Sequence, residues 1–322
     1  TAGNINVSQA IVLSGRNSAV AAIENVAGNN TLAGNLSVDV GGGNYWIQSD
    51  AGLLTLAGTV SALATGSRTF GFLGAGNLTI SGILSDGNGS VSLVKSGAGT
   101  LTFLGANAYS GTTTISGGTL QVGNGGSAGV LGTNNLTDNG TLVYNLSSAV
   151  TAPNTIGGIG SVTWEGRGTL TCNTPNSYSG GTKLTLGIIQ ANNNTAFGSG
   201  PITSDTGAGN GRIILGSGVT IANAFTANSV NAGAGNLGLI MVNDNTSATD
   251  SGSITFNANA TAGGHFAGPP TTGLLTISGP VNAAPGVFLV IRAGNVRFSG
   301  GGSYGEIQPR ANTTSVGGNN GL

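Results

Sequence analysis

The stretch from Leu93 to Val122 reads LVKSGAGTLTFLGANAYSGTTTISGGTLQV. Three pieces of it, Thr100–Leu104, Thr112–Ser116 and Thr119–Val122, alternate apolar and hydroxylated residues with period two. This alternation is typical of β-strands with one buried face, and the glycine-rich corners between the pieces are typical of tight turns. The stretch therefore predicts three short strands in close succession.

The same frame occurs three times along the chain. A glycine that opens a strand is followed ten residues later by a tyrosine in each copy, and the copies are offset by 69 and then by 126 residues. A fixed spacing of this kind indicates a repeat architecture with modules near residues 93–145, 162–215 and 290–322. The repeat-defining residues are Gly99, Leu101, Tyr109, Gly111, Gly168, Leu170, Tyr178, Gly180, Gly294, Val296 and Tyr304.

The bulk composition favours one folded, all-β body. The 322 residues include 61 glycines, and only 6% of the residues are charged. Leu, Ile and Val nevertheless recur in pairs one residue apart, which disordered chains of low complexity lack. We therefore predict one continuous, single-stranded solenoid over residues 1–322, because a solenoid grows along one axis without dividing into domains.

Two stretches depart from the pattern. Residues 17–26, NSAVAAIENV, have two interpretations, a short amphipathic helix that caps the solenoid or an ordinary coil. From 231 to 270 the pattern loosens around Asp244, Asp250 and His265. Insertions in a solenoid map to loops on one face, so these three residues mark a possible binding loop. The alternative is one further module of degenerate sequence.

Charge and chemistry argue against several classes of function. Nine basic and ten acidic residues are scattered singly and give a net charge of -1, so no basic stripe favours nucleic acid. No apolar run approaches the ~20 residues of a membrane-spanning helix, so we expect no membrane insertion of this segment. Neither clustered carboxylates nor a partner for His265 is present, so we expect no catalytic residue, metal site or cofactor. The single cysteine, Cys172, is interpreted as a buried apolar residue.

The repeat resembles a known family. Its first copy follows the pattern KxGxGTLTLxGxNxYxGxTxIxxGTLxV over Lys95–Phe103, Asn107–Ile115 and Gly118–Val122. This is the pattern of the passenger-associated transport repeat of bacterial autotransporter proteins. The second copy retains Gly166–Thr171 and Asn176–Leu184, and the third is partial. The resemblance implies a right-handed parallel β-helix outside the cell or on the surface of a bacterium.

We expect a structural protein without enzymatic activity, a surface stalk, an adhesin passenger or a fibre subunit. The third copy stops at Leu322, where the first continues into a strand, so either the polypeptide is longer or another molecule covers that edge. The expected partners are a second copy, bound head to tail through the terminal coils, or a surface glycan. One alternative is a carbohydrate-binding or polysaccharide-active site in residues 231–270. Another is binding to ice or a flat surface through arrays such as Thr100/Thr102 and Thr112/Thr114.

Overall fold

The computed structural model describes residues 4–15, 17–152, 155–206, 211–229, 239–243, 245–257, 264–267, 273–287, 289–303, 307–309 and 313–317. Within these residues the regular structure consists of β-strands, and every described strand pair is parallel. The predicted fold class, an all-β parallel solenoid, is confirmed. The chain divides into two compact units, unit 1 (Thr1–Leu146 and Pro153–Ser161) and unit 2 (Ser147–Ala152 and Val162–Leu322).

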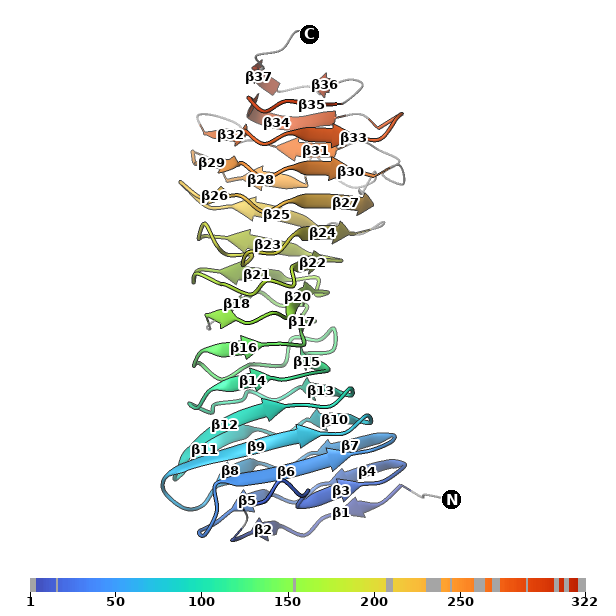
Figure 1. Ribbon diagram of the computed structural model, residues 1–322, viewed down its shortest axis with the longest axis vertical. Coiled ribbons are helices and arrows are strands. Elements are labelled where there is room, and N and C mark those ends of the chain that lie inside the picture. Colours follow the sequence, from blue (N-terminus) through green and yellow to red (C-terminus); the bar gives the residue numbers. More distant parts are fainter. Residues whose placement is uncertain are drawn as a thin grey trace. The chain divides into compact units, whose positions relative to one another are not determined.

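Unit 1 is a coil with three faces (Figure 1). Its first ladder contains, in order, β1 (Asn6–Val7), β4 (Asn29–Leu32), β7 (Leu53–Leu56), β10 (Asn77–Ile80), β13 (Thr100–Phe103), β15 (Thr119–Val122) and β17 (Thr141–Tyr144). Its second contains β2 (Ile11–Leu13), β5 (Leu36–Val38), β8 (Val60–Ala62) and β11 (Leu84–Gly87). Its third contains β3 (Ile23–Asn25), β6 (Asn44–Ser49), β9 (Ser67–Leu73), β12 (Ser90–Lys95), β14 (Thr113–Ile115), β16 (Leu136–Asp138) and β19 (Ile156–Gly157).

Unit 2 repeats this plan. One ladder contains β20 (Ser161–Trp164), β22 (Thr182–Leu184), β24 (Ile202–Asp205), β27 (Phe225–Ser229), β30 (Ile254–Phe256), β33 (Val281–Ala283) and β35 (Gly302–Ser303). A second contains β18 (Val150–Ala152), β21 (Thr169–Cys172), β23 (Ile188–Ala191), β25 (Arg212–Leu215), β28 (Ile240–Val242), β31 (Gly264–Ala267) and β34 (Leu289–Phe298). A third ladder contains β26 (Thr220–Ile221), β29 (Ser247–Asp250) and β32 (Leu274–Ile277), and it also ends on β34. β34 pairs in addition with β36 (Ile307–Pro309) and β37 (Thr313–Gly317).

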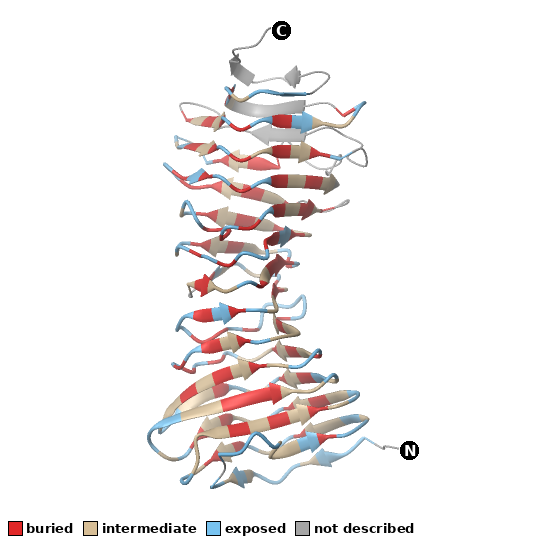
Figure 2. Cartoon of the chain, in the orientation of Figure 1, coloured by how far each residue is buried: buried red, intermediate tan, exposed pale blue. Residues whose placement is uncertain are grey.

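The core of each unit follows from the period-two pattern. Buried and half-buried residues alternate along the strands (Figure 2), because successive side chains of a strand point to opposite faces. In unit 1 the inward side chains of Leu56, Ile80 and Phe103 stack in register on consecutive coils and are fully buried. Each large side chain buried in this way contributes roughly 1.5–3 kcal/mol. Stacked apolar side chains therefore stabilise a fold that has few charged groups.

The two irregular stretches of the sequence have different outcomes. Residues 17–26 contain no helix; Ile23–Asn25 forms β3 and pairs with β6, so the ordinary-coil interpretation is confirmed. The described part of residues 231–270 contains four strands that pair with their neighbours along the solenoid: β28, β29, β30 and β31.

Candidate functional site: the repeat corners

In the first two repeats the tyrosine lies inside the coil and bonds to a threonine four residues later. The hydroxyls of Tyr109 and Thr113 share a hydrogen bond of 2.7 Å, and those of Tyr178 and Thr182 share one of 2.6 Å. All four residues are buried. Because a buried hydroxyl without a partner is costly, the pair lets the corner bury a large aromatic ring at little polar cost. The Tyr-Ser-Gly motif therefore has a structural role at the corner of the coil.

The same spacing in both repeats also places an asparagine at this corner, two residues before the tyrosine. The side chain of Asn107 accepts a hydrogen bond from Leu84 N at 2.8 Å and donates one to Val130 O at 2.8 Å. Leu84 belongs to the preceding coil and Val130 to the following one, so one amide joins three levels of the unit. In the second repeat, Asn176 donates to Ala196 O at 2.8 Å. These bonds satisfy backbone groups that the turn removes from the strand ladders.

The glycines of the repeat permit close contact between coils. A Cβ atom at Gly99 would lie 1.9 Å from Gly76 O, and one at Gly111 would lie 2.3 Å from Val91 O. A Cβ at Gly168 in the second repeat would lie 2.0 Å from Ser148 O. Any larger residue at these positions would separate the adjacent coils. The glycines are therefore needed for packing.

Lys95 is a buried cation that the coil corner accommodates. Its Nζ donates hydrogen bonds to Ser96 O and Gly97 O at 2.9 Å and to Gly117 O at 3.3 Å. Burial lowers the pKa of this amine to about 8. The equivalent position in the second repeat is the fully buried Trp164. A cation bonded to carbonyls and an aromatic ring thus fill the same corner in the two units.

Two aspartates, Asp138 and Asp250, are the last residues of their strands and have side chains that face the core. Each begins an Asp-Xaa-Gly corner. Oδ1 of Asp138 accepts a hydrogen bond from Gly140 N at 2.9 Å, and Oδ1 of Asp250 accepts one from Gly252 N at 3.0 Å. Both residues have no exposed surface. Burial raises the pKa of Asp138 to about 6 and that of Asp250 to about 7, although the N–H donors lower both. These carboxyl groups are positioned to close corners, out of reach of a ligand.

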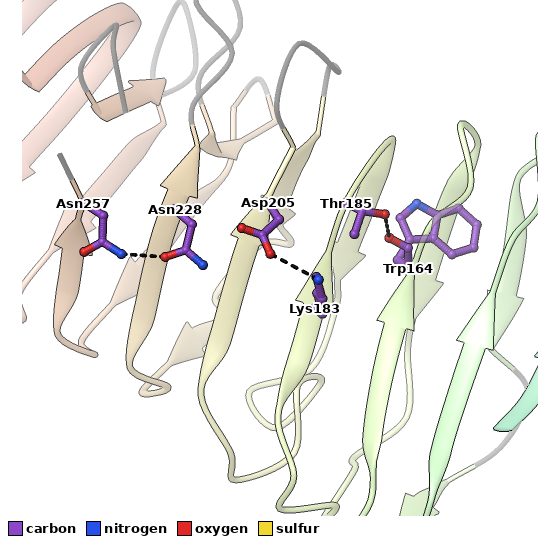
Figure 3. Close-up of polar contacts among 6 residues, drawn as sticks. All are labelled: Trp164, Lys183, Thr185, Asp205, Asn228 and Asn257. Atoms are coloured by element: carbon purple, nitrogen blue, oxygen red, sulfur yellow. Dashed lines mark hydrogen bonds and ion pairs between the residues drawn. The ribbon is translucent and has the colours of Figure 1, made fainter. Parts of the chain in front are cut away.

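On the outer face of unit 2, polar side chains connect successive coils (Figure 3). Lys183 and Asp205 form an ion pair of 3.2 Å between β22 and β24, and Thr185 donates a hydrogen bond to Trp164 O. Further along the same ladder, Asn257 donates to Asn228. The ion pair is half exposed, so it contributes at most ~1 kcal/mol. These contacts stabilise the stacking and do not converge on one site.

The structure places the expected site residues as follows. Asp250 lies inside the coil on β29, and the backbone of His265 lies in β31. Asp244 and Tyr304 lie outside the described residues. Asp250 therefore cannot contact a glycan without opening the coil. Among the other repeat-defining residues, Leu101, Leu170 and Val296 are buried strand positions, Gly294 lies in β34, and Gly180 is exposed at a corner.

The sequence pattern contains several residues of these corners, but their bonding roles were not predicted from it. The threonine and asparagine partners, Thr113/Thr182 and Asn107/Asn176, recur at the same offset of 69 residues as the tyrosines. The repeat spacing itself was therefore the signal that identifies them. No such signal predicted the inward position of Lys95 and Asp138. Charged residues usually face solvent, so the residue types gave no reason to expect these two inside the coil.

The fold and its corners define a class of protein, a parallel β-solenoid built from repeated modules with internal tyrosine corners. A sequence model of the family described as passenger-associated-transport-repeat matches residues 93–122 and 165–191. The chain accordingly contains two copies of the passenger-associated transport repeat of autotransporter proteins, as the sequence resemblance indicated. Comparisons with curated proteins and with solved structures gave no match. Among the described residues, no group of three His, Cys, Asp or Glu side chains is arranged to hold a metal, and no helix is suited to crossing a membrane.

Proposed function

We propose that the chain is the structural, non-enzymatic part of a bacterial passenger that is secreted or displayed on the cell surface. The observation that carries this proposal is the pair of passenger-associated repeats, each of which builds complete coil corners in its own unit. A solenoid of this kind extends by adding coils, and stacking neighbouring coils supplies its stability.

The placement of the reactive side chains supports a structural role. Lys95 binds corner carbonyls, Asp138 and Asp250 close corners, and Cys172 is buried, where burial raises the pKa of its thiol to about 12. Oδ1 of Asp86, although partly buried, accepts hydrogen bonds from the N–H groups of Val91 and Ser110. Each of these groups thus contributes to the stacking of the coils.

Surface display is tested with the native full-length gene. An epitope inserted in the exposed loop 124–128 of unit 1 should be labelled by antibody on intact cells, or recovered in the medium if the passenger is released. An epitope-tagged periplasmic protein in the same cells serves as the control for leakage. Labelling that requires cell lysis, with no epitope in the medium, would contradict the proposal.

The fibre variant of this role requires stacking between copies. Within the described residues β1, β2 and β3 each pair with a strand on one side, and such edges can accept another strand. Contacts of this head-to-tail kind generate open filaments. Electron microscopy of the purified chain at rising concentration distinguishes a fibre subunit from a surface stalk or adhesin. Filaments of uniform width would favour the fibre, and single particles at every concentration would contradict it.

A further inference from the structure

One face of unit 1 carries threonines in unbroken register. The outward residues Thr31, Thr55, Thr79 and Thr102 lie opposite one another on the consecutive strands β4, β7, β10 and β13. A second rank begins at Thr100, which is followed in register by Thr119 and Thr141 on β15 and β17. The two ranks meet on β13. We call these seven residues the threonine face.

The hydroxyls of the threonine face have no hydrogen-bond partner among the described residues. All seven side chains are half-buried and point away from the core, since the residues between them on each strand are buried. Inward threonines behave differently, because Thr113 and Thr182 bond to tyrosines. The seven hydroxyls are therefore free to bind water or an external partner.

The face is also regular and neutral. Neighbouring strands of a sheet are ~4.8 Å apart and alternate residues of one strand are ~6.7 Å apart, so the hydroxyls form two evenly spaced rows that lie side by side only on β13. Among the described residues of β4, β7, β10, β13, β15 and β17 none is charged. Their aromatic residues, Phe103 and Tyr144, are buried. A matching rank in unit 2, Thr203, Thr226 and Thr255, is shorter and adjoins Lys183.

We propose that the threonine face binds the surface of ice. Each hydroxyl can hold one water molecule, and the strand ladder repeats these positions at a constant interval. Water held in these evenly spaced rows is complementary to the repeating surface of a crystal of water. A face without charge attracts no ions that would displace this water. A single soluble sugar fits less well, because small-ligand sites are concave. Crystalline polysaccharide is the other ordered, neutral, hydroxyl-bearing surface, and the experiment distinguishes it.

The test is an ice-recrystallisation assay on the purified chain. The parent protein should arrest the growth of ice grains at micromolar concentration. The double substitution Thr55→Lys/Thr79→Lys inserts charge and bulk into the middle of the first rank, and should raise the concentration required by about tenfold or more. Thr137→Lys, an exposed outward position on the third ladder of the same unit, is the matched control and should act like the parent.

Folding of each variant is checked by circular dichroism and by tryptophan fluorescence, to which Trp46 of unit 1 contributes. If the Thr55→Lys/Thr79→Lys variant does not fold, the Thr55→Gln/Thr79→Gln variant replaces it. The glutamines disrupt the rank by bulk alone. An inactive parent, or full activity in the face variant, would overturn the proposal. Binding of the parent to crystalline cellulose without an effect on ice would also overturn it and assign the face to polysaccharide.

Discussion

Removing the buried carboxyl group of Asp250 should change how the stability of unit 2 depends on pH. Burial, opposed in part by the N–H of Gly252, raises the pKa of Asp250 from 3.8 to about 7. Its Oδ2 has no hydrogen-bond partner among the described residues. In Asp250→Asn, the side chain keeps its shape and can still accept the bond from Gly252 N, but it no longer titrates.

The sign follows from proton binding. Between pH 3.8 and about 7 the folded state binds the proton of Asp250 and the unfolded state releases it, so the free energy of unfolding falls as pH rises. The contribution is complete below pH 3.8 and is lost as pH passes through about 7. Since one pKa unit corresponds to ~1.4 kcal/mol, this group accounts for at most ~4 kcal/mol across that interval. Asp138 should have the same effect in unit 1, over the range up to about pH 6.

The assay exploits the two tryptophans of the chain. Trp164 is fully buried in unit 2 and Trp46 belongs to unit 1, so a Trp46→Phe background makes fluorescence a reporter of unit 2. Urea unfolding at several pH values between about 4 and 8 then gives the free energy of unfolding with and without Asp250→Asn. Asp205→Asn, which removes a partly exposed carboxylate of the same unit, is the control.

We expect the stability difference between Asp250→Asn and its parent to shift in favour of the variant as pH rises. The Asp205→Asn control should retain the slope of the parent. Parallel pH profiles for parent and Asp250→Asn would refute the reasoning, because they would mean that the carboxyl group is solvated or paired in the folded unit. A parent that becomes more stable between about pH 4 and pH 7, relative to the variant, would refute the sign.

Two further substitutions test the repeat corners by urea unfolding monitored by circular dichroism. Tyr109→Phe removes a hydroxyl that bonds to Thr113 and to the N–H of Gly132, so it should lower the stability of unit 1 by about 1–3 kcal/mol. Adding Thr113→Val should recover part of this loss. A Tyr109→Phe protein of unchanged stability would exclude the corner role. Gly99→Ala places a Cβ 1.9 Å from Gly76 O and should lower the free energy of unfolding by about 1–3 kcal/mol. At Gly117 the nearest atom to an added Cβ is 4.0 Å away, so alanine should be tolerated there. Equal effects at the two glycines would contradict the packing argument.

The sequence was sufficient for the fold class and the repeat frame. Alternating residues such as those of Thr100–Phe103 bury one face wherever the strand lies, and the close contacts at Gly99 and Gly111 admit no side chain. These are local requirements, so they repeat visibly along the chain. The same local rules left residues 17–26 open, because an alanine-rich stretch is compatible with a helix or a coil until its neighbours are known.

Only the tertiary structure decided which residues share a face. Leu32, Leu56, Ile80 and Phe103 stand in register although the intervals between them are 24, 24 and 23 residues, because corners of different length are absorbed between strands. A shift of one residue would turn each strand over. Register across the coils therefore aligned the threonine face and placed Asp250 inside the core, and neither can be inferred from one coil alone.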